Sequence, residues 1–193
     1  MAEAAREDAW WTGDALECIK SLVKGVLAMH DLLLIHNDIK PDNVMISPDR
    51  RSVRIIDFGL STMSQVGMEK YGTPGYRAPE FATATAALTG WQARAAEAWA
   101  VGVTALQFAS GVKHIEPKQL ADALRARSLR QDYVLALAAR TNEPQWVQKL
   151  AKKVGGGKVM QDGDVFYEFI YSLLSYEAQS RTRAMRAFVT PVE

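Results

Sequence analysis

Apolar residues in the first part of the chain recur every three or four positions, which is the spacing of one face of an α-helix. They are Leu16, Ile19, Leu22, Val23, Val26 and Leu27. Asp14 is followed three residues later by Glu17, an arrangement suited to capping a helix start. The pattern therefore predicts a helix over residues 14–30.

A change of period follows this helix. After an apolar run at residues 32–35, two short segments of β-forming residues, 44–46 and 53–56, flank a polar, turn-rich stretch at residues 47–52. Two such segments joined by a short turn are typical of a β-hairpin. We therefore expect a hairpin between residues 44 and 56.

Residues 94–110 are apolar almost all round the helical period, and Gly111 is placed to end the helix. A helix of this kind belongs inside a domain. Further helices are predicted to begin near Pro117, Glu143 and Asp164, whereas the glycine triplet at 155–157 is typical of a surface loop. The chain contains no internal repeat or long linker, so we expect one mainly α domain over residues 1–193.

Composition describes an ordinary globular chain, with 193 residues, 48% hydrophobic residues, 23% charged residues and a net charge of +1. Lys and Arg are not in excess, so nucleic acid is not an expected partner. The single cysteine, Cys18, has no partner for an internal disulfide. We find no secretory leader and no apolar run of membrane-spanning length, and therefore expect a soluble protein of the cytoplasm or another intracellular compartment.

Candidate chemistry lies on both sides of the predicted hairpin. Asp38 is followed at two positions by Lys40 and at five by Asn43, and Asp57 comes fourteen residues after Asn43. A hairpin between Asn43 and Asp57 returns a carboxylate to the side of an amide oxygen, and Mg²⁺ prefers hard oxygen ligands. Asp38 then lies alongside as a proton acceptor. Each residue alone is more typical of a turn, so the hypothesis depends on their joint occurrence.

Residues 72–80 read Gly-Thr-Pro-Gly-Tyr-Arg-Ala-Pro-Glu and supply a third segment. With the segments around Asp38 and Asp57, it resembles the eukaryotic-type serine/threonine protein kinase family. The resemblance covers about residues 14–188. It implies the C-lobe of a protein kinase, of the α+β family: a helical bundle in which small β-hairpins carry the catalytic and metal loops.

The resemblance also implies roles for individual residues. Asp38 is the catalytic base, and Lys40 neutralises charge on the transferred phosphoryl group. Asn43 and Asp57 bind the Mg²⁺ that accompanies ATP. Thr73 bridges Asp38 and Lys40, which favours a Ser or Thr acceptor in a protein substrate.

The remaining family positions concern the peptide-binding segment and the scaffold. Gly75 and Tyr76 are expected to position the substrate peptide. Four residues are expected to be structural: His36, Glu80, Trp99 and Arg181. His36 is expected to brace the catalytic loop, and Glu80 is expected to form an ion pair with Arg181.

Two positions depart from the family pattern. Asn37 stands where many members have an Arg that pairs with a phosphorylated loop, so activation through that contact is not expected. Glu97 stands where an Asp usually braces the catalytic loop. We expect its extra methylene to displace the carboxylate and to leave Asp38 less well positioned.

Nothing before Asp14 matches the glycine-rich loop or the lysine-bearing strand of the ATP-covering N-lobe. We therefore expect a C-lobe alone, weak or inactive in isolation, with the N-lobe supplied by upstream sequence or separately. One alternative is a noncatalytic, pseudokinase-like interaction module. A small-molecule phosphotransferase is a third reading, which Lys40 and the segment 72–80 make less favourable.

Overall fold

The computed structural model describes residues 15–49, 51–64, 72–82, 84–110, 169, 170, 172–175 and 177–190. Its long helices are α2 (Ala15–Asp31), α3 (Trp91–Ser110) and α8 (Ala178–Val189). The strands of this described part are short: β1 (Leu34–Ile35), β2 (Val44–Ile46), β3 (Val53–Ile55) and β4 (Thr62–Met63). The mainly α expectation is thus confirmed for the described residues.

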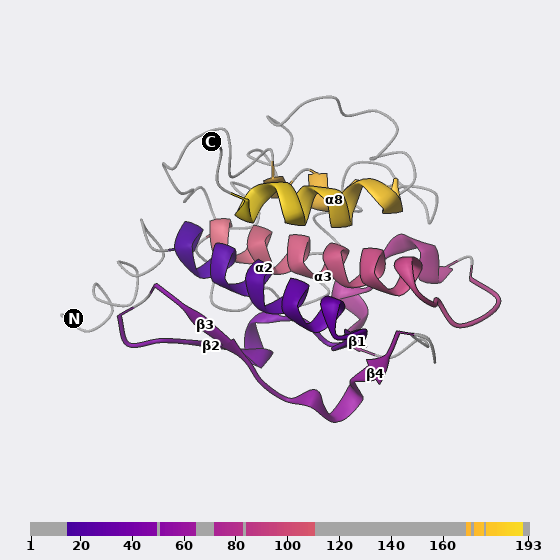
Figure 1. The fold of residues 1–193 in the computed structure, drawn as a ribbon, viewed down its shortest axis with the longest axis horizontal. Helices are drawn as coiled ribbons and strands as arrows, with labels where there is room; N and C mark the ends of the chain where they lie inside the picture. The colour runs from indigo at the N-terminus through magenta and orange to yellow at the C-terminus, as the bar shows by residue number, and fades with distance from the viewer. Residues whose placement is uncertain are drawn as a thin grey trace.

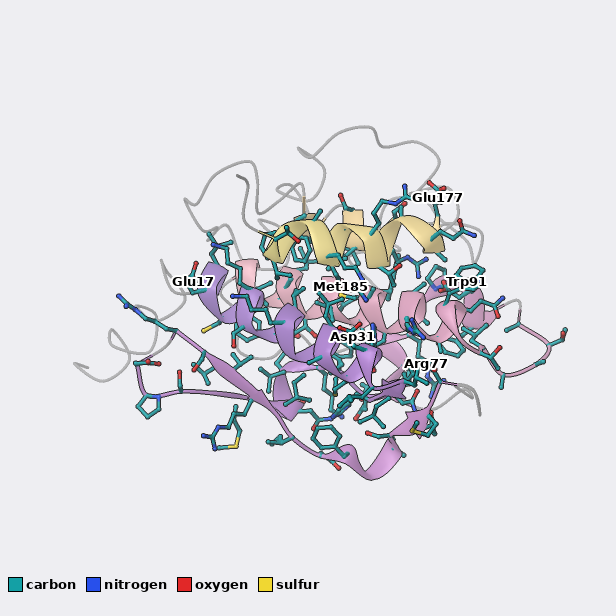
Figure 2. The ribbon with its side chains drawn as sticks, in the orientation of Figure 1. Glu17, Asp31, Arg77, Trp91, Glu177 and Met185 are labelled. Carbon is teal, nitrogen blue, oxygen red and sulfur yellow. The ribbon has the colours of Figure 1, made fainter. Side chains whose placement is uncertain are left out.

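The elements form three layers, with α2 and α3 in the middle (Figure 1). Helix α8 lies on one side of this pair and contacts both helices, whereas the strands lie on the other side, where β1 and β3 contact α2. Met185 of α8 is fully buried and points toward the central helices (Figure 2). The apolar face of α2 is buried as its periodicity predicts, since Ile19, Val23 and Val26 have no exposed surface.

The predicted hairpin is confirmed as the antiparallel pair β2 and β3, in which Val44 faces Ile55 and Ile46 faces Val53. A second antiparallel pair was not predicted: Leu34 of β1 faces Met63 of β4. Two-residue strands carry no period that a sequence pattern can reveal. Together the two pairs hold both ends of residues 36–43 and both ends of residues 56–61.

Helix α3 is buried as its all-round apolar pattern predicts, because residues 95–108 are all buried. It begins three residues before the predicted start. Its first two residues, Trp91 and Gln92, are exposed and therefore do not belong to the buried apolar pattern. For this reason the pattern alone places the start of the helix too late. No helix in the described part of the chain is long and apolar enough to cross a membrane.

The C-terminal part of the chain is described only in pieces. The helices predicted near Pro117 and Glu143 and the glycine triplet lie outside the described residues, as does the start of the helix predicted at Asp164. The helical residues Phe169, Ile170 and Leu173 are nevertheless buried, as that prediction requires. Helix α8 was missed because its sequence is mostly polar and its apolar residues are few.

Gly102 allows the close approach of α3 to residue Leu173. A Cβ atom at position 102 would lie 2.8 Å from the Leu173 Cβ and 3.1 Å from the Leu174 Cδ2. We expect Gly102→Ala to lower the free energy of unfolding by about 1–3 kcal/mol, as overpacked cores do, in denaturant titrations. Gln92→Ala, at an exposed position of the same helix, is the control and is expected to stay within about 0.5 kcal/mol of the wild type. Equal stability of the two variants would contradict the close approach.

Candidate active site

Asp38, Lys40 and Thr73 form a closed cluster, although 35 residues separate the first from the last. The Asp38 Oδ2 lies 2.8 Å from the Lys40 Nζ, and that ammonium donates to the Thr73 Oγ1 at 2.9 Å. The hydroxyl and the backbone N–H of Thr73 both donate to the Asp38 Oδ1, each at 2.9 Å. The bridge implied by the family resemblance is therefore present as geometry, while the catalytic roles remain predictions.

This cluster sets the ionisation of Asp38. Burial alone raises the pKa of the carboxyl, but the hydrogen bonds from Lys40 and Thr73 outweigh it and hold the pKa below its ordinary value. The carboxylate is therefore ionised at neutral pH. It can accept a proton, and its two oxygens are held in one orientation.

Asn43 and Asp57 present oxygen atoms from neighbouring segments. The Asn43 Nδ2 donates to the Asp38 carbonyl at 2.8 Å and to the Asp38 Oδ2 at 3.0 Å, and the amide oxygen takes no part in these two bonds. The backbone N–H of Ile56 donates to the Asn43 carbonyl at 3.0 Å, which brings Asp57 to this loop. Asp57 adopts a left-handed conformation with φ +61°, and its exposed carboxylate accepts from the Gly59 N–H at 3.3 Å.

These donors fit Mg²⁺. One carboxylate and one amide oxygen are hard ligands, and Mg²⁺ usually keeps waters and substrate phosphates for its other positions. A metal ion held by Asn43 and Asp57 would therefore need waters or substrate phosphates to complete its coordination.

His36 connects residues 36–43, which we call the catalytic loop after the family motif that they resemble, to the segment that carries Asp57. Its Nε2 donates to the Ile56 carbonyl at 2.9 Å, and its Nδ1 accepts from the Asp38 N–H at 3.3 Å. Its ring also meets the Phe58 ring edge-on, with the centroids 5.0 Å apart. The bracing position predicted for His36 is observed, and the pattern of donors places its proton on Nε2.

The expected displacement of the Glu97 carboxylate is wrong. Its Oε1 accepts from the backbone N–H groups of His36 at 2.6 Å and Asn37 at 2.9 Å, so the longer side chain still reaches the catalytic loop. Its Oε2 accepts from the Nε2 of His30, in α2, at 2.8 Å. The sequence alone could not show that the Glu97 side chain contacts both α2 and the catalytic loop.

Asn37 has a positioning contact that the sequence did not reveal. Its Nδ2 donates to the Leu60 carbonyl at 2.6 Å and to the Thr62 Oγ1 at 2.9 Å. Asn37 also has φ +70°, a conformation that Asn tolerates better than most residues. A neutral amide thus ties the catalytic loop to β4.

Residues 72–80 lie against the catalytic loop and α3. A Cβ at Gly72, which has φ +80°, would overlap the Asn37 carbonyl oxygen, so this position requires glycine. Gly75 and Tyr76 form a 3₁₀ turn, and the Tyr76 hydroxyl donates to the Gln107 Oε1 of α3 at 2.5 Å. Burial, with smaller effects of the Asp42 and Asp38 charges, raises the pKa of Tyr76. Tyr76 therefore joins residues 72–80 to the buried helix α3.

The ion pair predicted between Glu80 and Arg181 is confirmed. The two guanidinium Nη atoms donate to the two carboxylate oxygens at 2.8 and 3.1 Å. Arg181 is fully buried, donates also to the Ser175 and Ala95 carbonyls, and lies with its guanidinium carbon 5.1 Å from the Trp99 ring centroid. Helix α8 is thereby joined to residues 72–80.

Comparison with known families agrees with this geometry. The chain matches the family model described as the protein kinase domain over residues 4–192. Because the match spans nearly the whole sequence, the chain belongs to the protein kinase domain family. The match does not confirm the expectation of a C-lobe alone.

Similar kinases match shorter stretches. Calcium/calmodulin-dependent protein kinase type 1 of Macrobrachium nipponense is 38% identical over 96 residues, which cover 48% of this chain and 26% of that protein. Serine/threonine-protein kinase pkn2 of Myxococcus xanthus is 40% identical over 79 residues, 35% of this chain and 9% of the relative. Death-associated protein kinase dapk-1 of Caenorhabditis elegans is 37% identical over 102 residues, 51% of this chain and 7% of its own length. The chain spans only a small part of each relative.

The buried ion pair predicts a large effect of removing its acid. Glu80→Gln strands the Arg181 charge, which should lower the free energy of unfolding by about 3–5 kcal/mol, toward the lower end because the Glu80 side chain keeps 22% exposure. The control is Asp31→Asn, which breaks an equally short pair with Arg186 on the surface. It should leave the denaturation midpoint close to that of the wild type. A small effect of Glu80→Gln would contradict the structural role.

The Thr73 hydroxyl is expected to lower the pKa of Asp38. Thr73→Val removes this donor while keeping the backbone N–H, so the pKa should rise toward the ordinary value of 3.8. Carboxyl ¹³C NMR titration measures it, with the exposed Thr89→Val as control. Because the folded pKa is depressed, ionised Asp38 stabilises the fold above its unfolded pKa and loses that contribution as pH falls through the folded pKa. An unmoved pKa in Thr73→Val would contradict the assignment.

Proposed function

We propose that the chain is a serine/threonine protein kinase catalytic segment that transfers the γ-phosphoryl group of Mg-ATP to Ser or Thr hydroxyls of protein substrates. The observation that carries this proposal is the cluster of Asp38, Lys40 and Thr73. A base, a cation and a bridging hydroxyl meet there from two distant segments. Membership of the protein kinase domain family supports it.

In the proposed reaction, the Asp38 carboxylate accepts the proton of the substrate hydroxyl. The hydroxyl oxygen forms a bond to the γ-phosphorus as the bond between that phosphorus and the ADP oxygen breaks. Lys40, whose Nζ lies 2.8 Å from Asp38, provides positive charge beside the transferred group. Asn43 and Asp57 would hold Mg²⁺, which when bound neutralises phosphate charge.

The acceptor class is inferred from the pairing of Lys40 with Thr73, which resembles the serine/threonine branch of the family. The name of the Myxococcus xanthus relative agrees with this class. Gly75 and Tyr76 belong to the segment on which the substrate peptide would lie. The Tyr76 side chain supports that segment from the interior rather than facing the peptide.

We also propose that the described residues correspond to the lobe that binds peptide and metal. In the described part of the chain, strands form only two two-stranded sheets, and both serve the catalytic and metal loops. Without a lobe that covers ATP, each missing phosphate donor would slow transfer by roughly 10²–10³-fold. The isolated chain is then weak or inactive, and a partner lobe restores the rate.

Exposed apolar side chains favour a second candidate, a noncatalytic interaction module. Met45, Phe58 and Leu60 are 59%, 48% and 42% exposed, although residues of this size usually prefer burial. Apolar surface of this kind favours association. Both candidates predict a partner, but only the kinase requires Asp38 and Asp57.

Paired substitutions separate the two candidates. The full chain is incubated with γ-labelled Mg-ATP and peptides that offer Ser, Thr or Tyr. Label should enter Ser and Thr, and Asp38→Asn should reduce the rate by roughly 10²–10⁴-fold, the usual contribution of a positioned base. Asp38→Asn should keep the rise in melting temperature caused by Mg-ATP, whereas Asp57→Asn should lose it.

Asp49→Asn, an exposed carboxylate in the β2–β3 turn, is the matched control and should retain both properties. Stabilisation by Mg-ATP is the deciding measurement, because the chain alone is expected to label peptides only weakly; if Mg-ATP does not stabilise the wild-type chain, the proposal is contradicted and the interaction module is favoured. Labelling of choline or an amino sugar without any polypeptide would instead indicate a small-molecule phosphotransferase.

A further inference from the structure

The end of α2, the end of β4 and the start of α3 meet at one corner of the molecule (Figure 1). The Ser64 N–H, directly after β4, donates to the Leu33 carbonyl at 2.7 Å. The Ser64 carbonyl in turn accepts from the Gly90 N–H at 2.9 Å. These two hydrogen bonds also bring together the chain neighbours of the three residues, which are Leu32, Met63 and Trp91.

The side chains of these three neighbours are large, apolar and exposed. Leu32 is 73% exposed, Trp91 51% and Met63 45%, and they make up half of the six large apolar side chains exposed in the described part of the chain. Leu33 has φ +60°, which is costly for a leucine, so the turn that presents Leu32 is kept at the expense of stability. We call Leu32, Met63 and Trp91 the corner patch. Exposed apolar side chains gathered in this way mark interaction sites.

Arg94 adds a cation beside the corner patch. It lies three residues after Trp91, so the two side chains are neighbours on one face of α3. Its Nε is buried and has no hydrogen-bond partner, which makes the observed orientation of the side chain costly. An acceptor outside the chain that draws the guanidinium outward therefore stabilises it.

The nearby acid does not satisfy Arg94. A hydrogen bond from Arg186 is the main cause that lowers the pKa of Asp31, and the positive charge of Arg94 lowers this pKa further, so Arg94 lies near the end of α2. The Asp31 carboxylate is nevertheless paired with Arg186 at 2.8 Å. The corner thus carries more positive than negative charge.

We propose that the corner patch and Arg94 bind a short segment of another protein that carries an acidic side chain beside large apolar ones. A carboxylate of the segment accepts hydrogen bonds from the Arg94 guanidinium, and its apolar side chains cover the corner patch. Trp and Arg are among the residues that most often dominate the binding energy of protein interfaces. The proposal does not rest on the proposed function, because none of these residues is given a role in phosphoryl transfer.

The size of the corner patch favours a short segment over a second copy of this chain. A stable interface buries about 800 Å² on each partner. A large aromatic side chain contributes only about 150–250 Å² when it is fully covered, so three partly exposed side chains fall short of that area. They are sufficient for one or two apolar anchors of a peptide.

An NMR titration of the ¹⁵N-labelled full chain tests the proposal. The probe is a synthetic helical peptide of Glu and Leu with one apolar face, and the comparison peptide has Lys in place of every Glu. The Glu peptide should shift the backbone amides of Leu32 and Met63 and the indole N–H of Trp91. The Lys peptide should bind roughly tenfold more weakly or less, because it offers Arg94 no acceptor.

Arg94→Gln and Trp91→Gln should each weaken binding of the Glu peptide roughly tenfold, the usual effect of losing a charge-assisted hydrogen bond or an anchor residue. Two variants elsewhere on the surface are matched controls: Lys20→Gln removes another cation, and Met45→Gln removes another exposed apolar side chain. Both should leave the affinity within about twofold of the wild type.

Absence of binding, or equal binding of the two peptides, would overturn the proposal. Shifts confined to Met45, Phe58 and Leu60 would also overturn it, because association would then use a different surface. Sedimentation velocity without peptide tests the other occupant: a dimer that Trp91→Gln dissociates would assign the corner patch to a second copy and overturn the proposal. Should Arg94→Gln fail to fold, Trp91→Gln and the Lys peptide decide by the same criteria.

Discussion

Burial of helix α3 imposes the constraint on which the candidate site depends. A polar group inside a protein is costly unless it is hydrogen-bonded, and two buried polar side chains of α3 have their partners in other elements. Glu97 meets the catalytic loop, and Gln107 meets Tyr76. The buried Ala95 carbonyl accepts a hydrogen bond from Arg181 of α8. One buried helix thereby contacts the catalytic loop, residues 72–80 and α8.

The strands complete this arrangement from the opposite side. The pair β2 and β3 sets Asn43 beside Ile56, and the pair β1 and β4 closes the same two segments at their other ends. Loops are usually the least restrained parts of a domain. Here two short antiparallel strand pairs restrict residues 36–43 and residues 56–61 at both ends. Asp38 and Asp57 can therefore keep their relative positions.

The two departures from the family pattern now have physical descriptions. Asn37 forms neutral hydrogen bonds to the Leu60 carbonyl and Thr62, where an Arg would depend on a phosphate for its partner. Glu97 reaches the loop despite its extra methylene, with His30 at its second oxygen. Both residues hold the catalytic loop through contacts that are present in the unmodified chain. Neither departure changes a residue to which the proposed phosphoryl transfer assigns a role.

The sequence alone was sufficient for features that depend on short spacing. The helices α2 and α3, the β2–β3 hairpin, the segments around Asp38 and Asp57, and the Glu80–Arg181 pair were all predicted, because periodicity and motif order are local or shared by the family. Tertiary structure decided the pairing of β1 with β4, the Asn37 contact with Thr62 and the reach of Glu97. These depend on the distance between segments that are 20 to 70 residues apart. Such distances are set by the packing of the elements against one another and not by the spacing of residues along the chain.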